Sequence, residues 1–209
     1  MNDTNLIERF KPADRANHWV TAITLILLAL SGLALFHPAF FWLTNLFGGG
    51  TWTRILHPFI GVVLAISFWM LAQRFHADNR ITAADREWMR RIRDVVANRS
   101  QNLPEVGRYN AGQKYLFWVM VTTIALLLVS GIVIWQPWFA PRFSIGLARV
   151  AVLIHALAAF VLTAGVLVHI YAVIWIKGTL RGMTRGSVTR AWAKHHHPGW
   201  YREVSKGPK

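Results

Sequence analysis

The stretch HALAAFVLTAGVLVH, from His155 to His169, holds thirteen residues without a formal charge between two histidines. It lies inside a longer charge-free stretch, residues 150–176, which exceeds the about 20 apolar residues that a helix needs to cross a bilayer. From His155 to His169 the helix advances by fourteen residues, and at about 100° per residue this rotation is about 40° less than four full turns. Both imidazoles therefore lie on one helix face, about 21 Å apart along the axis. The stretch therefore predicts a membrane helix with one histidine near each side of the membrane.

Three further long stretches of the chain lack Asp, Glu, Lys and Arg. Together the four stretches predict four spans, near residues 16–36, 54–75, 113–135 and 147–176. The composition agrees, because 54% of the residues are hydrophobic and 15% are charged, whereas soluble domains carry about 25% charged residues. We therefore predict an all-α membrane protein, a four-transmembrane-helix bundle in which the backbone polar groups are bonded within helices.

The basic residues are distributed unequally between the two sides of these spans. Of the 23 Lys and Arg residues, three precede the first span, nine lie from Arg74 to Lys114, and eight lie from Lys177 to Lys209. The other three are Arg54, Arg142 and Arg149. Since basic residues gather on the inner side, we expect a multi-pass protein of the bacterial cytoplasmic (inner) membrane with both termini in the cytoplasm. Topology and contact with anionic membrane lipids explain the net charge of +14, so we expect no nucleic-acid partner.

No internal repeat or low-complexity linker is evident, which indicates a single domain, residues 1–209. Thr82 and Asp85 stand at capping-box spacing, and residues 83–97 predict an interfacial helix in the cytoplasmic loop. The apolar stripe of this helix consists of Trp88, Met89, Ile92, Val95 and Val96. Acidic residues precede the first span, unlike a signal peptide, so we expect that span to be retained.

The cytoplasmic tail, residues 177–209, is basic and aromatic and contains three consecutive histidines, His195 to His197. We expect this tail to contact the membrane surface or a partner protein. A metal-binding tract and incidental exposed histidines are the alternatives.

The chain contains no cysteine, which excludes iron–sulfur ligation, disulfides and covalent haem attachment. Histidines are then the informative residues, because polar groups are costly at bilayer depth and a neutral imidazole binds metals well. An interhelical hydrogen bond, worth about 0.6 to 2 kcal/mol, is the alternative for any single histidine. Two histidines on one face favour two stacked haems, and a haem with two axial histidines suits electron transfer because it has no open site.

The fourth predicted span runs from outside to inside, which places His155 near the outer face and His169 near the inner face. The candidate partners are His37 and His57 at the outer face, and His18 and His76 at the inner face.

The prolines help to choose between the outer candidates. His37 directly precedes Pro38, which disfavours a helix there, whereas Pro58 is tolerated in the first turn of a span that contains His57. At the inner face, His76 falls beyond the end of its span. The favoured axial pairs are therefore His57 with His155 for the outer haem iron, and His18 with His169 for the inner haem iron.

Spacing alone also fits a haem-free membrane anchor or a channel whose histidines conduct protons. The chain lacks the G-x-G-x-x-G nucleotide motif and a long outer segment. An electron donor must therefore be a partner protein.

Several segments resemble the cytochrome b (gamma) subunit of respiratory formate dehydrogenase, a family of dihaem four-helix membrane cytochromes. They are RANHWVTAI, RILHPFIGVV, GRYNAGQKYLFW, LVSGIVIWQPWFAP, LIHALAA, VHIYAVIWIKGT and AWAKHHHPGWYREV. These segments touch all four spans and the tail, so the resemblance covers most of the chain. Gln136 and Gly199 depart from the family pattern, in which arginine is usual at both positions.

The resemblance implies two b haems held by the four favoured histidines. It also implies a quinone site beside the inner haem, formed by Asn110, Gly112, Gln113 and His169, where menaquinone or ubiquinone is reduced near the cytoplasmic side. The implied donor is a periplasmic iron–sulfur (beta) subunit, and formate is oxidised by a molybdenum or tungsten catalytic (alpha) subunit in anaerobic respiration. The chain would thus be the quinone-reducing subunit of a formate:quinone oxidoreductase; a cytochrome b of a hydrogenase or thiosulfate-type reductase is the alternative.

Overall fold

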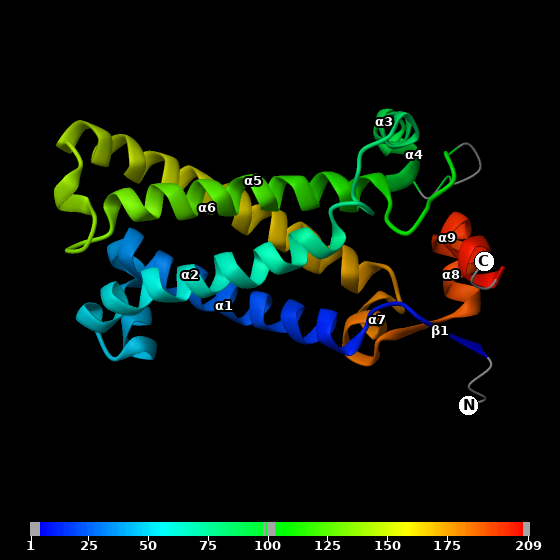
Figure 1. The fold of residues 1–209 in the computed structure, drawn as a ribbon, viewed down its shortest axis with the longest axis horizontal. Helices are drawn as coiled ribbons and strands as arrows, with labels where there is room; N and C mark the ends of the chain where they lie inside the picture. The colour runs from blue at the N-terminus through cyan, green and yellow to red at the C-terminus, as the bar shows by residue number, and fades with distance from the viewer. Residues whose placement is uncertain (1–4, 98, 100–102, 207–209) are drawn as a thin grey trace. The chain divides into compact units, whose positions relative to one another are not determined.

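The computed structural model describes residues 5–97, 99 and 103–206, and four long helices dominate it (Figure 1). These helices are α1 (Pro12–Phe36), α2 (Gly50–Phe75), α5 (Ala111–Ile134) and α6 (Ile145–Trp175). Each is long and apolar enough to cross a membrane. The prediction of an all-α protein with four spanning helices is confirmed.

The helix ends differ from the predicted span ends by a few residues. α1 begins at Pro12 rather than at residue 16, and α2 begins at Gly50 rather than at residue 54. Charge-free stretches locate only the part of a helix that lies in hydrocarbon, whereas a helix continues into the headgroup region, where Arg15 and Arg54 are tolerated.

The described residues form two compact units. The first, here called the helical unit, consists of Ala16–Gln73 and Val119–Val168 and contains most of the four long helices. The second, here called the tail unit, consists of the described residues within Met1–Arg15, Arg74–Trp118 and His169–Lys209. Residues 1–4, 98, 100–102 and 207–209 of the expected single domain lie outside the described residues.

Within the helical unit, side chains connect the helices in pairs. The Phe36 ring of α1 lies edge-on to Phe160 of α6, with centroids 5.8 Å apart. Phe59 of α2 lies edge-on to Trp135, just after α5, at 5.1 Å. Asn17 Nδ2 of α1 donates a hydrogen bond of 3.1 Å to the carbonyl oxygen of Ser67 of α2. Such polar contacts hold membrane helices together where lipid removes the hydrophobic drive between them.

Two short 3₁₀ helices lie between consecutive long helices of this unit. The 3₁₀ helix η2 (Pro38–Phe47) joins α1 to α2, and η4 (Ala140–Arg142) lies between α5 and α6. His37 caps η2, because its Nδ1 accepts a hydrogen bond of 3.2 Å from the Ala39 N–H.

The tail unit contains a small sheet that the sequence did not predict. Strand β1 (Leu6–Glu8) pairs antiparallel with β2 (Ser187–Thr189), with Ile7 opposite Val188. The turn before β2 depends on Gly186, whose φ is 81°. An added Cβ there would lie 3.0 Å from the Phe10 carbonyl oxygen, so only glycine fits without strain.

The predicted interfacial helix at residues 83–97 is two helices, α3 (Ala83–Arg90) and α4 (Ile92–Val96). The predicted capping box at Thr82 and Asp85 is present. The predicted apolar stripe is divided, since Trp88 is buried in the protein while Val96 is 82% exposed. Trp88 therefore packs within the tail unit, and contact of this segment with the membrane stays a prediction.

The cytoplasmic tail forms α7 (Thr179–Arg185), α8 (Arg190–His196) and α9 (Pro198–Ser205). The start of α9 contacts a loop of the same chain. The Gly199 N–H donates to the Val106 carbonyl oxygen at 3.0 Å, and an added Cβ would lie 3.1 Å from that oxygen. Glycine thus suits this close approach of two backbone segments.

Candidate functional site

His57 of α2 and His155 of α6 face each other inside the helical unit. Their ring centroids are 6.3 Å apart and their planes are inclined by 62°. A metal–imidazole bond is about 2.0 Å long and a ring centre lies roughly 1.1 Å from each ring nitrogen, so two imidazoles on opposite sides of one metal have centroids roughly 6 Å apart. This pair therefore fits the two axial ligands of one haem.

Both imidazoles are hydrogen-bonded through Nδ1 to a buried serine on a neighbouring helix. Ser31 Oγ of α1 lies 2.7 Å from His57 Nδ1, and Ser130 Oγ of α5 lies 3.0 Å from His155 Nδ1. With Nδ1 engaged in each ring, Nε2 is the nitrogen available to a metal. The sequence analysis missed both serines, although the repeated Ser-Gly dipeptide at Ser31 and Ser130 was the available signal.

The other outer candidate, His37, has a local role. Besides capping η2 through Nδ1, its ring lies edge-on to Phe40, with centroids 6.2 Å apart. This use of His37 agrees with the choice of His57 as the partner of His155.

The inner histidines lie in different compact units. His18 of α1 belongs to the helical unit, where its ring is edge-on to Trp19. His169 belongs to the tail unit, and it shares the unbroken helix α6 with His155, as predicted. The pairing of His18 with His169 stays a prediction.

The predicted quinone residues Asn110 and Gln113 form a reciprocal cap at the start of α5. Asn110 Oδ1 accepts a hydrogen bond of 2.9 Å from the Gln113 N–H, and Gln113 Oε1 accepts one of 3.0 Å from the Asn110 N–H. Each side-chain oxygen has a structural partner, while the amide NH₂ groups are the donors left for a ligand. At Gly112 an added Cβ would lie 3.7 Å from the Trp88 ring, so Trp88 closely approaches this turn.

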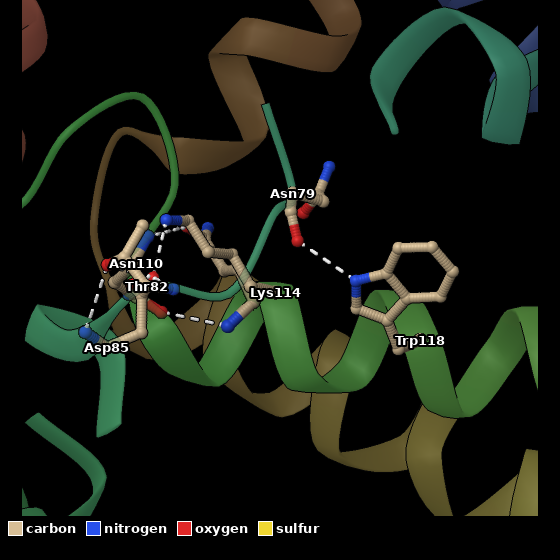
Figure 2. Close-up of polar contacts among 7 residues, drawn as sticks. Asn79, Thr82, Asp85, Asn110, Lys114 and Trp118 are labelled. Atoms are coloured by element: carbon tan, nitrogen blue, oxygen red, sulfur yellow. Dashed lines mark hydrogen bonds and ion pairs between the residues drawn. The ribbon is translucent and has the colours of Figure 1, made fainter. Parts of the chain in front are cut away.

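A cavity of about 190 Å³ lies beside Asn110 and is lined also by Tyr109, Lys114 and Asp85. Lys114 Nζ donates to Asp85 Oδ2 at 2.8 Å, and the two side chains are only 13% and 9% exposed. Thr82 donates to the same carboxylate oxygen through its N–H and its hydroxyl, each at 2.7 Å. Figure 2 shows these three residues gathered next to Asn110.

The charge states around this cavity follow from its contacts. Burial acts to raise the pKa of Asp85, but hydrogen bonds from Lys114 and Thr82 outweigh it, so the pKa lies below its ordinary value. Burial also raises the pKa of Tyr109. The positive charges of Arg108 and Arg9 act to lower this pKa, but burial outweighs them. The cavity thus carries a carboxylate and a neutral phenol at neutral pH. Sequence analysis found the cap at Asp85 but missed its pairing with Lys114.

Nearby, one hydrogen bond attaches α5 to the segment that follows α2. The Trp118 Nε1–H donates to the Asn79 carbonyl oxygen at 2.9 Å, as Figure 2 shows. Asn79 is itself buried, and its Nδ2 donates to the Phe75 carbonyl oxygen at 2.9 Å. These contacts position the start of α5 and the cavity residues it carries.

The third tail histidine, His197, is buried and structural. Its Nδ1–H donates to the Gly107 carbonyl oxygen at 2.9 Å, and its ring packs on Trp192. Burial first, and then the positive charge of Arg9, lowers the pKa of His197 to about 4. At this residue the tail contacts its own chain.

Comparison with known proteins gives one family and a consistent set of relatives. The prokaryotic cytochrome b561 family matches residues 9–186. The chain is 47% identical over 206 residues to the "Formate dehydrogenase, cytochrome b556(fdo) subunit" of Escherichia coli (strain K12), covering 99% of this chain and 97% of that protein. It is 42% identical over 206 residues to the nitrate-inducible cytochrome b556(Fdn) subunit of formate dehydrogenase from the same strain, covering 99% and 95%. It is 40% identical over 202 residues to a formate dehydrogenase cytochrome b556 subunit of Haemophilus influenzae, covering 97% and 84%.

Proposed function

This chain belongs to the prokaryotic cytochrome b561 family, and on that basis we propose that it is the membrane subunit of a formate:quinone oxidoreductase. Family membership makes it a membrane b-type cytochrome with four apolar spanning helices. The assignment to formate oxidation is supported by relatives of 40 to 47% identity that are named as formate dehydrogenase subunits. The single observation that carries the redox role is the facing pair His57 and His155.

We assign the outer haem to His57 and His155, and the inner haem to His18 and His169. When bound, each haem takes up and releases one electron, so two haems allow electrons to cross the membrane. The chain's own contribution is to supply neutral imidazoles at fixed positions. Ser31 and Ser130 bond to the first pair and restrict how those rings can turn.

The partners follow from what the chain lacks for the complete reaction. With no cysteine, the chain cannot ligate iron–sulfur clusters through thiolates, so a separate iron–sulfur subunit delivers electrons to the outer haem. Formate is oxidised on a molybdenum or tungsten catalytic subunit. We place these partners outside the cytoplasmic membrane, with both termini of this chain in the cytoplasm.

The proposed quinone site includes Asn110, Gly112, Gln113 and His169. A quinone takes up two protons with its two electrons, so its pocket needs polar groups and a route for protons. The cavity beside Asn110 supports this placement because Lys114 and Asp85 line it. Its volume of about 190 Å³ is below the roughly 300 Å³ of a pocket for a drug-sized ligand, so it suits a quinone ring whose isoprenoid tail lies elsewhere.

The proposal is tested on the complex purified with its partners. Haem is quantified as the pyridine haemochrome, and formate is added without oxygen while the visible spectrum is recorded. We expect two b haems per chain, both reduced by formate and reoxidised by added quinone. A preparation without a b-type spectrum would contradict the proposal and favour a haem-free anchor. Reduction by hydrogen but not by formate would indicate a hydrogenase-type partner.

A further inference from the structure

The two serines that contact the outer histidines occur in the same local arrangement. Ser31-Gly32 lies on α1 and Ser130-Gly131 lies on α5. Each serine bonds the histidine of the next long helix, 26 residues later in the first case and 25 in the second. The sequence shows no long repeat, but the outer site is built from two copies of one small unit.

The hydrogen bonds of the serines determine which imidazole nitrogen carries the proton. The Ser31 hydroxyl donates to the Leu27 carbonyl oxygen at 2.8 Å, and the Ser130 hydroxyl donates to the Leu126 carbonyl oxygen at 2.6 Å. A hydroxyl has one proton and two lone pairs, so each serine oxygen is left as an acceptor toward the imidazole. With the serine oxygen accepting, each Nδ1 carries the hydrogen, and the Leu127 carbonyl oxygen is a second acceptor at the His155 ring. Each Nε2 then has a lone pair for a metal.

The glycine of each pair brings the ring close to the helix backbone. An added Cβ at Gly32 would lie 3.6 Å from His57 Cε1. One at Gly131 would lie 3.4 Å from His155 Cε1. Both distances are ordinary van der Waals contacts, so a methyl group just fits, whereas a larger side chain would displace the ring. The Ser-Gly pair therefore restrains the imidazole by a hydrogen bond and by contact.

We propose that Ser31 and Ser130 are positioning residues for the outer haem, which hold both ligands in the Nδ1–H tautomer and set their donor strength. This inference rests on the proposed ligation by His57 and His155. A ligand histidine that donates its other N–H to an acceptor is a stronger base toward its metal. A stronger axial base stabilises the oxidised iron and lowers the potential of the haem.

The test uses the complete complex with Ser31→Ala, with Ser130→Ala and with both substitutions. Thr123→Ala is the matched control, because Thr123 lies two turns earlier on α5 and makes the same back-bond, to Val119 O at 2.8 Å. The readouts are the haem content, a redox titration of each haem and the low-temperature EPR spectrum of the oxidised protein.

We expect both single variants to keep two haems, with a raised midpoint potential for one haem and an unchanged potential for the other. The expected size is up to about tenfold in the ratio of oxidised to reduced haem, which is 59 mV for a one-electron couple. The EPR signal of the same haem should change, the double variant should shift further, and Thr123→Ala should match the wild type. Potentials and EPR spectra like those of the wild type in all three serine variants would overturn the proposal.

Haem loss in a variant is interpreted with Ser31→Thr and Ser130→Thr, which keep the acceptor oxygen. Recovery of haem by the threonine variant supports a positioning role, while loss in alanine and threonine variants alike counts against it. The proposed function fails separately, if the wild-type complex lacks b haem or if His57→Ala and His155→Ala both retain two haems.

Discussion

In the helical unit the buried polar side chains are neutral, whereas the tail unit also buries charged ones. Among the described residues, the buried polar side chains of the helical unit are Thr21, Ser31, Thr44, Thr53, Ser67, Thr123 and Ser130. Those of the tail unit are Arg9, Asn79, Asp85 and His197. A hydroxyl can satisfy its proton on a carbonyl of its own helix, which suits a segment surrounded by lipid. A buried charge requires a partner of opposite sign or an aromatic face.

Arg9 shows how the tail unit meets that requirement. Its guanidinium carbon lies 4.2 Å from the centroid of the Trp200 ring, a cation–π contact that stabilises a desolvated charge. Burial lowers the pKa of Arg9 to about 10, partly offset by Tyr109, so the guanidinium is still charged at neutral pH. The comparison teaches that the helical unit buries polar groups that its own helices can satisfy, while the tail unit also buries charges that need partners from distant segments.

The largest effect is expected when a proposed haem ligand is removed from the helical unit. In His57→Ala we expect one of the two haems to be lost, and we expect formate to leave the other haem oxidised because electrons enter through the outer haem. Haemochrome analysis and the formate-reduced spectrum measure both results. His37→Ala is the control and should keep two haems, since His37 caps η2. Two formate-reducible haems in His57→Ala would disprove the assigned wiring.

In the tail unit, protonation of His197 should release α8 and α9 as the pH falls. Above pH 6.5 the histidine is neutral whether the tail is docked or open, so docking is fully stable. Because the docked pKa is about 4, the open state alone binds the proton between pH 6.5 and 4, and docking loses stability across that window. The difference in pKa corresponds to about 3 kcal/mol at the acidic end.

Hydrogen exchange of residues 187–201 at several pH values measures this loss. His197→Gln is the control, and its exchange free energy should depend less on pH over the same window, with the remaining dependence due to His196, whose pKa is also lowered by burial. Equal pH dependence in the wild type and in His197→Gln would show that another group is responsible.

A smaller effect is expected from the ion pair beside the cavity. Lys114→Met leaves the Asp85 carboxylate buried without its cation, which should cost about 2 to 3 kcal/mol, less than a fully buried pair because both side chains retain some exposure. Hydrogen exchange of α3 measures the change. The double variant Asp85→Asn with Lys114→Met should recover most of the loss. If the double variant is as unstable as the single one, the pair does not stabilise this part of the tail unit.

The smallest effect concerns the turn before β2. Gly186→Ala should destabilise the β1–β2 pair by about 1 to 2 kcal/mol, because alanine disfavours a positive φ. Gly146→Ala is a matched change in the first turn of α6, where an added Cβ meets nothing within 4 Å, and it should be neutral or slightly stabilising. The protection of the Val188 amide against hydrogen exchange is compared between the Gly186→Ala and Gly146→Ala variants. Equal protection in both variants would argue against strain at Gly186.

Much of the helical unit could be predicted, because membrane spans leave a strong signal in charge. The charge-free stretches located α1, α2, α5 and α6. The prolines that follow His37 and His57 distinguished the two histidines, because His37 caps η2 whereas His57 lies within α2. Ser31 and Ser130 could not be identified in the same way. A serine in an apolar helix commonly bonds its own backbone, and its second bond, to a histidine on another helix, depends on how the helices pack.

The tail unit was predicted less well, because its structure depends on contacts between distant segments. β1 and β2 are three residues each, too short for a strand pattern. The side of α3 that carries Trp88 was predicted as apolar, but periodicity does not show whether a protein surface or a membrane covers it. Lys114 could not be predicted as the partner of Asp85, because the two residues are 29 positions apart in the sequence.

A density map of the chain within its complex, at a resolution that separates side chains, tests the central claim most directly. We predict a flat macrocycle between α2 and α6, with its metal bonded to the Nε2 atoms of His57 and His155 and with each Nδ1 facing a serine oxygen. The claim is contradicted if both imidazoles are bonded only to protein side chains or water and no macrocycle lies between them.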